Sequence, residues 1–232
     1  REISVEGGRV RAVVTDRGTI GCRTVINAAG AHAYHVALLA GLELPIVPVR
    51  HEYLVTVECE GLHPSLPVVR IPDATLYLRA EMGALLLGGW EPRAVSVDPR
   101  KFSLERPAPD ITEDWEVLAA FGKELSPLFP RVNELGIRSV FRGWPTFVPD
   151  GQFIVGESSR VRGFVLAGGC NAHGVSGSAG IGRHVVESLL DDEPSDYVKS
   201  LSPDRFAAGS WTWERAKRDA QRVYETYYAV GH

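Results

Sequence analysis

Two groups of residues in this 232-residue chain have types and a spacing that could serve chemistry. The first is a glycine-rich loop, residues 168–176, which follows the apolar run 164–167 and precedes a predicted helix. Such a short apolar run is typical of a strand buried on both faces. Glycines at the start of a helix let a ligand approach the backbone, and free N–H groups there favour a negative charge. The stretch 163–190 therefore predicts part of a cofactor site.

The second group consists of histidine and aromatic side chains in the middle of the chain. His51 and Tyr53 lie on one face of the predicted strand 47–57, because side chains alternate along a strand. Tyr77 belongs to the next predicted hairpin, and Trp90 ends it. The histidine and tyrosine are either a half-buried pair in a sheet or a polar pair lining a pocket.

Two other places could also bind a ligand. Small residues at 28–30 follow a predicted strand, which allows either a close cofactor contact or a plain tight turn into the helix predicted for 31–40. His32 and His35 could face the same side of that helix, but no cysteine or carboxylate nearby completes a metal site. We therefore expect no metal.

These side chains must be positioned by two kinds of element. The first residues predict a meander of strands at 3–5, 9–15 and 24–26, with Gly7 and Gly8 in a hairpin turn. The middle of the chain predicts an antiparallel sheet covered by one helix, which begins with Thr112 as its cap. A further helix is predicted over 211–229.

Composition narrows the class of protein. The chain is 44% hydrophobic and 23% charged, and its net charge is −4, so nucleic acid is not an expected partner. No apolar run approaches the about 20 residues that span a bilayer, so we expect no membrane partner. The three cysteines lie far apart, which favours a reducing compartment over a disulfide framework and predicts a cytoplasmic location.

Six short runs, taken in order, resemble the D-amino-acid oxidase-like FAD-dependent oxidoreductase superfamily, and within it the dimethylglycine and sarcosine dehydrogenases. The runs are residues 25–30, 48–56, 77–79, 147–151, 169–174 and the tail from 204–206 to 227–228. The resemblance implies a mixed α+β or α/β fold. In it, a partial FAD-binding domain (1–41 and 140–232) is interleaved with an antiparallel-sheet substrate domain (42–139).

The resemblance also implies a chemistry. The cofactor is FAD, and hydride passes to flavin N5 from an N-methylated amino acid such as dimethylglycine or sarcosine, whose nitrogen is unprotonated. Reduced flavin is negative near N1 and O2, and a helix N-terminus at 174–177 would stabilise that charge. The expected cofactor contacts are Ala28, Ala29, Gly30, Pro149, Asp150, Gly169, Asn171, His173, Gly174, Val175 and Ser176.

Four residues are the expected catalytic or pocket-lining groups: His51, Tyr53, Tyr77 and His173, with Trp90 in the substrate pocket. His173 could line the flavin edge or handle a proton. Alternatively, it is a loop histidine that is hydrogen-bonded to the backbone.

The chain departs from the family pattern in one important respect, because it has no Gly-x-Gly-x-x-Gly for the FAD pyrophosphate. We therefore expect the C-terminal portion of a flavin module, with a second chain or an upstream segment supplying that motif. Ser176 stands where sarcosine oxidases carry a substrate-binding lysine, so the amine itself stays open.

Three hypotheses follow for function. The first is an FAD-dependent amine dehydrogenase or oxidase acting on CH–NH donors, in the cytoplasm, or in the mitochondrial matrix of a eukaryote. The second is a subunit that is inactive alone and serves as a structural or assembly partner. The third keeps the flavin but changes the substrate to a D-amino acid or glycerol phosphate.

Overall fold

The computed structural model describes residues 1–106 and 108–228, which form two compact units. Unit 1 consists of Arg1–Val49, Ser96–Pro109 and Pro145–Val223. Unit 2 consists of Arg50–Val95, Asp110–Trp144 and Tyr224–His232. Each unit has its own sheet, so the mixed α/β fold class predicted from the sequence is confirmed. The functional domain ranges 1–41, 140–232 and 42–139 stay a prediction.

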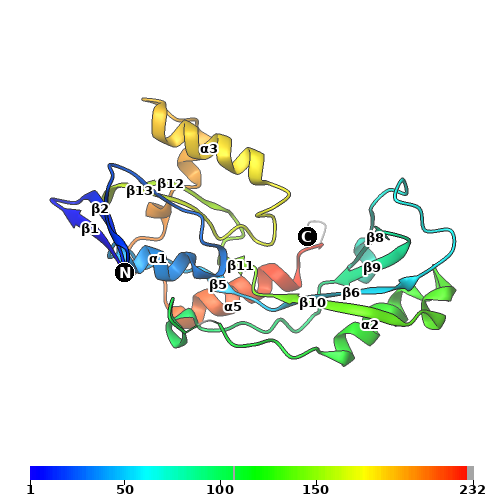
Figure 1. Cartoon of the computed structure of the whole chain (residues 1–232). Coiled ribbons are helices and arrows are strands. Elements are labelled where there is room, and N and C mark those ends of the chain that lie inside the picture. The colour runs from blue at the N-terminus through cyan, green and yellow to red at the C-terminus, as the bar shows by residue number, and fades with distance from the viewer. Residues whose placement is uncertain (107, 229–232) are drawn as a thin grey trace. The chain divides into compact units, whose positions relative to one another are not determined.

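Unit 1 is built on a six-stranded sheet (Figure 1). Its strands are β1 (Glu2–Glu6), β2 (Arg9–Thr15), β3 (Gly18–Gly21), β4 (Val25–Asn27), β12 (Ile154–Ser158) and β13 (Val161–Gly168). The main order is β1-β2-β13-β12, β3 pairs with β2, and β4 pairs in parallel with β13. Phe164, Val165 and Leu166 of β13 are fully buried, as the apolar run predicted.

The predicted meander is wrong in its third strand. Residues 18–21, and not 24–26, return along β2, because the chain turns at once at Gly18, whose φ of 134° is left-handed backbone. The apolar residues Val25 and Ile26 are thereby left to pair with the buried strand β13, opposite Phe164 and Val165.

A helix packs on this sheet, and shorter elements complete unit 1. Figure 1 shows α3 (Ser178–Leu190) over β12 and β13, where Ile181 and Val185 pack on Val155 and Val165. The other elements of unit 1 are η1 (Gly30–His32), α1 (Ala33–Leu39), β5 (Val47–Pro48), η3 (Pro99–Lys101), β11 (Thr146–Phe147), α4 (Asp196–Ser200) and η5 (Pro203–Arg205). The last helix, α5 (Trp213–Glu225), is shorter than predicted, and the boundary between the units falls within it. Position 229 of the predicted helix lies outside the described residues.

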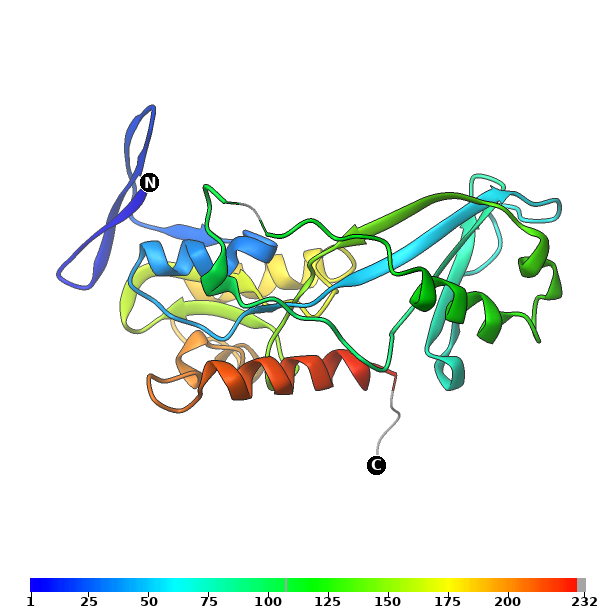
Figure 2. The same ribbon diagram turned by 90° about the horizontal axis from the view of Figure 1, so that it is seen from below.

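Unit 2 is a five-stranded antiparallel sheet with the order β10-β6-β9-β8-β7. The strands are β6 (His51–Glu58), β7 (Val69–Ile71), β8 (Leu76–Glu81), β9 (Ala84–Gly89) and β10 (Ile137–Gly143). Figure 2 shows α2 (Trp115–Leu125) beside this sheet, where Leu118, Phe121 and Leu125 pack on Leu54 and Leu87. Short turns η2 (Pro72–Ala74) and η4 (Pro130–Glu134) complete the unit.

Two local predictions for unit 2 need correction. The strand predicted for 47–57 is two strands, because Pro48 has no N–H to continue a ladder and β5 pairs with β11 instead of the unit 2 sheet. The cap of α2 is Asp114 and not Thr112, since the Asp114 carboxylate accepts the N–H of Val117 at 3.2 Å. Both residue types cap helices well, so the place where packing begins decides between them.

Candidate active site

In unit 1, one buried side chain joins two of the loops that were predicted to contact the cofactor. Asn171, which is 3% exposed, follows β13. Its Oδ1 accepts the N–H of Val148 at 3.0 Å, and its Nδ2 donates to the carbonyl of Gly151 at 2.8 Å. Its own N–H donates to Thr146 at 2.9 Å. The loops 146–151 and 168–176 are thus held together by a single asparagine.

The backbone of this loop is bent into the left-handed region at three positions. Gly169, Asn171 and Ala172 have φ values of 59°, 45° and 63°. Glycine and asparagine tolerate this conformation, whereas it costs alanine roughly 1–2 kcal/mol. A Cβ at Gly169 would lie 2.5 Å from Val148 Cγ1, so the loops approach too closely for a side chain there. Strain of this kind is often held at functional sites.

After this bend, the loop presents backbone donors. In the part of the chain that the structure describes, the N–H groups of Gly174, Val175 and Ser176 have no hydrogen-bond acceptor. Val175 is 91% exposed, and Gly177 caps α3 without a side-chain hydrogen bond. Three free N–H groups before a 13-residue helix suit oxygen or nitrogen atoms that carry negative charge. The arrangement therefore fits the pyrimidine edge of a flavin.

Residues 28–30 lie at the same edge of the unit 1 sheet. They follow β4, and Gly169 follows β13, its parallel neighbour. In sheets with parallel strands, ligands bind beyond the carboxyl ends of those strands. The buried Asn27 shapes this turn, because its Nδ2 donates to the carbonyl of Ala33 at 2.8 Å and its Oδ1 accepts the N–H of Ala29 at 3.2 Å.

Two other predicted residues of unit 1, Asp150 and His173, have contacts within the chain. The Asp150 carboxylate pairs with Arg205 at 2.7 Å, and it follows Pro149 in the same loop. His173 Nδ1 lies 3.0 Å from the carbonyl of Asn171, which is the backbone contact of the alternative interpretation. The cofactor role of these residues stays a prediction.

In unit 2, His51 lies at the centre of a hydrogen-bonded chain. Its Nε2 is 2.8 Å from the Tyr77 hydroxyl, and its Nδ1 is 3.0 Å from the Tyr224 hydroxyl. The Trp90 ring stacks on the imidazole, with 4.7 Å between ring centroids. Burial lowers the pKa of His51 to about 4, so the ring is neutral near pH 7. His51, Tyr77 and Trp90, all expected from the sequence, are therefore brought together.

The hydrogen-bonded chain continues from Tyr224 to Glu91, an acidic residue that was not predicted from the sequence. The Tyr224 hydroxyl donates a short hydrogen bond to Glu91, and both residues are buried. Glu91 lies 3.5 Å from the Arg50 guanidinium, which in turn pairs with Asp114 at 2.8 Å. Burial raises the pKa of Glu91, although the Tyr224 hydrogen bond and Arg50 act in the opposite direction. Burial also raises the pKa values of Tyr77 and Tyr224.

A local pattern could have located Tyr224. Ala216, Ala220 and Tyr224 recur every four residues on α5, and all three are buried. No such pattern precedes Glu91, which simply follows Trp90.

Tyr53 has a different environment from the one expected for a partner of His51. Its ring stacks on Phe141 across the β6-β10 pair, at 5.0 Å between centroids. Among the described residues, no hydrogen bond joins Tyr53 to His51. That Tyr53 lines the substrate pocket stays a prediction.

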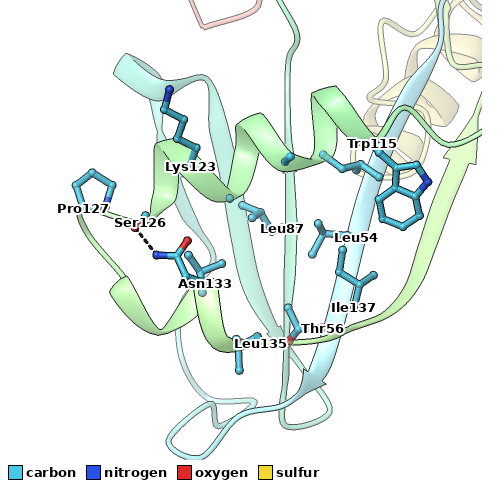
Figure 3. A pocket seen from close by; sticks show the side chains of 14 residues that line it. Leu54, Thr56, Leu87, Trp115, Lys123, Ser126, Pro127, Asn133, Leu135 and Ile137 are labelled. Carbon is cyan, nitrogen blue, oxygen red and sulfur yellow. Dashed lines mark hydrogen bonds between the residues drawn. The ribbon is translucent and has the colours of Figure 1, made fainter.

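The described residues of unit 2 line at least two cavities. One, of about 810 Å³, is lined by Arg50, Glu91, Asp114 and Trp90. Glu91, the acidic end of the hydrogen-bonded chain through His51, therefore faces this cavity. A second, of about 400 Å³, lies between α2 and the sheet (Figure 3). Its lining includes four leucines, and Asn133 donates to Ser126 at 2.7 Å. It contains no member of the His51 chain.

The described residues contain no group of three or more histidine, cysteine or acidic side chains that could hold a metal ion. His35 instead lies within hydrogen-bonding distance of the Pro99 and Phe102 carbonyls, at 2.8 and 2.9 Å. No helix among residues 1–106 and 108–228 is long and apolar enough to cross a membrane.

Comparison with known proteins gives three kinds of match. The mitochondrial sarcosine dehydrogenase of Mus musculus is 30% identical over 225 residues, which are 95% of this chain and 24% of that protein. The 4-methylaminobutanoate oxidase (formaldehyde-forming) of Paenarthrobacter nicotinovorans is 29% identical over 230 residues, 96% of this chain and 27% of that protein. The chain thus spans about a quarter of the length of these curated relatives.

Among solved structures, L-proline dehydrogenase from P. horikoshii has the same fold, with a TM-score of 0.76 at 22% identity over 89% of this chain and 53% of that chain. A family model described as FAD dependent oxidoreductase matches residues 1–188. Because this match covers most of the chain, the chain belongs to the FAD-dependent oxidoreductase (DAO) family, whose cofactor is FAD, as its sequence motifs predicted.

Proposed function

We propose that this chain supplies part of the FAD site and the amine-binding residues of an oxidoreductase that oxidises an N-methylated amino acid. The observation that carries the proposal is the hydrogen-bonded chain through His51, which holds a neutral imidazole and a tyrosine hydroxyl side by side. The names of two relatives, a sarcosine dehydrogenase and a 4-methylaminobutanoate oxidase, support an N-methyl amine as substrate.

Unit 1 is the proposed cofactor-binding part. The N–H groups of residues 174–176 would hold the negative edge of the flavin, and the small residues 28–30 would allow close approach of the backbone. When bound, FAD accepts the two electrons of the substrate C–H bond as a hydride. The protein contributes orientation and electrostatics to this step.

Unit 2 is the proposed substrate-binding part. An amine can release a hydride from its neighbouring carbon only when its nitrogen lone pair is free, so an ammonium substrate must first lose a proton. The partly exposed Tyr77 hydroxyl would accept the ammonium N–H, and the neutral His51 behind it can take up the hydroxyl proton. Trp90 stacks on His51 and so fixes the plane of the imidazole.

A substrate panel tests the proposal on the full-length natural polypeptide with FAD bound, called the holoprotein below. Sarcosine, dimethylglycine and 4-methylaminobutanoate are each mixed anaerobically with it, and bleaching of the visible flavin band is followed. We expect at least one of them to reduce the flavin. Reduction by glycerol phosphate or a D-amino acid alone would contradict the N-methyl substrate, and a polypeptide that binds no FAD would favour the role of an assembly partner.

A further inference from the structure

The hydrogen bonds around His51 have a single direction. The Tyr224 hydroxyl donates its only proton to Glu91, so its oxygen accepts the bond from His51 Nδ1. A neutral imidazole that is protonated at Nδ1 has an acceptor at Nε2, and the Tyr77 hydroxyl therefore donates to it. The tautomer follows from the network. Each donor in this hydrogen-bonded chain, from Tyr77 through His51 to Tyr224, thus points toward the Glu91 carboxylate.

Among the described residues, no group donates to the Tyr77 oxygen, so this direction leaves its lone pairs free at the partly exposed end of the hydrogen-bonded chain. The opposite end is the buried Glu91, which borders the cavity of about 810 Å³. A cavity of this size holds many water molecules, so a proton on Glu91 has a route to solvent.

We propose that Glu91 is the terminal acceptor of the proton that the substrate ammonium group must lose, and that Tyr224 is the residue linking it to His51. This inference rests on the proposed function. It assigns roles to two residues that never touch the substrate, so Tyr224 and Glu91 act through Tyr77 and His51.

The transfer balances in four moves. The ammonium N–H bond breaks as its proton binds the Tyr77 oxygen, and the original Tyr77 proton moves to His51 Nε2. The Nδ1 proton of His51 then moves to the Tyr224 oxygen, and the Tyr224 proton moves to the Glu91 carboxylate. The products are a neutral amine and a protonated Glu91, and the three relay residues keep their charge.

The surroundings of Glu91 allow it to hold a proton. Burial raises its pKa, whereas the nearby Arg50 and the Tyr224 hydrogen bond partly oppose that effect. Glu52 shares Arg50 with Glu91, at 3.3 Å from the guanidinium. The other charged groups that line the cavity are Asp73, Arg93, Asp114, Glu116, Glu124 and Glu225.

Two isosteric variants of the holoprotein test the relay, Glu91→Gln and Tyr224→Phe. Each breaks the path with little change in side-chain volume, so kcat/KM for sarcosine should fall by about 10²-fold at pH 7. The loss should shrink by about tenfold per pH unit above pH 7, because the free amine then needs no acceptor. Glu124→Gln, which removes an exposed carboxylate from the same cavity, and Tyr197→Phe on unit 1 should match the wild type.

A second readout is independent of turnover. In the dithionite-reduced holoprotein, sarcosine should produce the infrared carbonyl band of a protonated carboxyl group, and Glu91→Gln should lack this band. Trimethylglycine has no N–H and should produce no band. Sarcosine should produce none in Tyr224→Phe either.

The outcomes separate the two proposals. Suppose that the protein oxidises amines, but that Glu91→Gln lowers kcat/KM equally at every pH or does not lower it at all. Either result overturns the relay and leaves the proposed function intact. Absence of amine oxidation together with the Glu91 band overturns the proposed function and supports the acceptor role.

Discussion

The hydroxyl of Tyr224 lies 3.0 Å from Nδ1 of His51, although 173 positions separate the two residues in the chain. This contact joins the last described segment of unit 2 to the first strand of its sheet. It gives His51 a partner on each ring nitrogen, which fixes the orientation of the imidazole. The hydrogen-bonded chain through His51 and the loops of unit 1 each lead to two testable predictions.

His51 should make stability depend on pH. Its pKa is about 4 in the folded protein and about 6.5 when unfolded, so the folded state favours the neutral ring. The contribution is complete above pH 6.5 and is lost as the pH falls toward 4, by at most about 3–4 kcal/mol. Urea unfolding of the holoprotein should show this slope, and His51→Gln should flatten it. The exposed His63→Gln variant should keep the slope, and an equal slope in both variants would contradict the assignment.

Gly88→Ala should displace Tyr77. A Cβ at position 88 would overlap the Tyr77 ring, which crosses β9 at that residue. We expect a stability loss of about 1–3 kcal/mol and a clear fall in kcat/KM for the amine. Gly122→Ala is the matched control, because a Cβ in that helix position meets open space and should stabilise α2 by up to about 1 kcal/mol. Wild-type kinetics in Gly88→Ala would show that Tyr77 needs no fixed position.

Asn171→Ala should weaken FAD binding. It removes the partner of the Val148 N–H and that of the Gly151 carbonyl, and a buried unpaired group costs about 1–3 kcal/mol. Calorimetry should show lower stability, and titration of the apoprotein should show about tenfold weaker binding of FAD. Asn133→Ala removes an exposed asparagine that bonds to Ser126 and should change neither value. Unchanged FAD affinity in Asn171→Ala would mean that the two loops act separately.

Val175→Glu should test where the flavin carries its charge. The side chain is 91% exposed, so folding should be unaffected, but a carboxylate beside the free N–H groups should repel the negative edge of the cofactor. We expect weaker binding of FAD and a lower flavin reduction potential. Val186→Glu places the same charge on an exposed position of α3 and serves as the control. Equal effects of the two substitutions would contradict the proposed flavin contact.

Elements whose signals lie in neighbouring residues could be predicted from the sequence. The apolar run at 164–167 and the four-residue repeat of Ile181, Val185 and Leu189 in α3 are properties of neighbouring residues, and both elements were predicted correctly. The partner of β4 is not local, because a strand of three residues pairs wherever a buried neighbour is available, and here that neighbour is β13. The motifs gave the family, and the comparisons confirm it.

The residues of the candidate site also divide into those with local sequence signals and those whose contacts are non-local. His51 and Tyr77 could be named because they lie on predicted strands and in family motifs, and Trp90 because it ends a predicted strand. The link between His51 and Glu91 could not be predicted, because the four-residue pattern on α5 marks Tyr224 as buried but does not say which distant side chains it contacts. Likewise, Asn171 was expected as a cofactor contact, while its hydrogen bonds to the neighbouring loop depend on a left-handed backbone that asparagine only permits.

The bonds of Asn171 have a consequence for how this protein can change over evolution. Because the side-chain amide of Asn171, in loop 168–176, satisfies a donor and an acceptor of loop 146–151, the energetic effect of a substitution in one loop depends on the residues present in the other. Two such changes are coupled, and their effects do not add. A change in how these loops contact the cofactor is therefore reached most easily by altering both loops together, while the sheet beneath them stays the same.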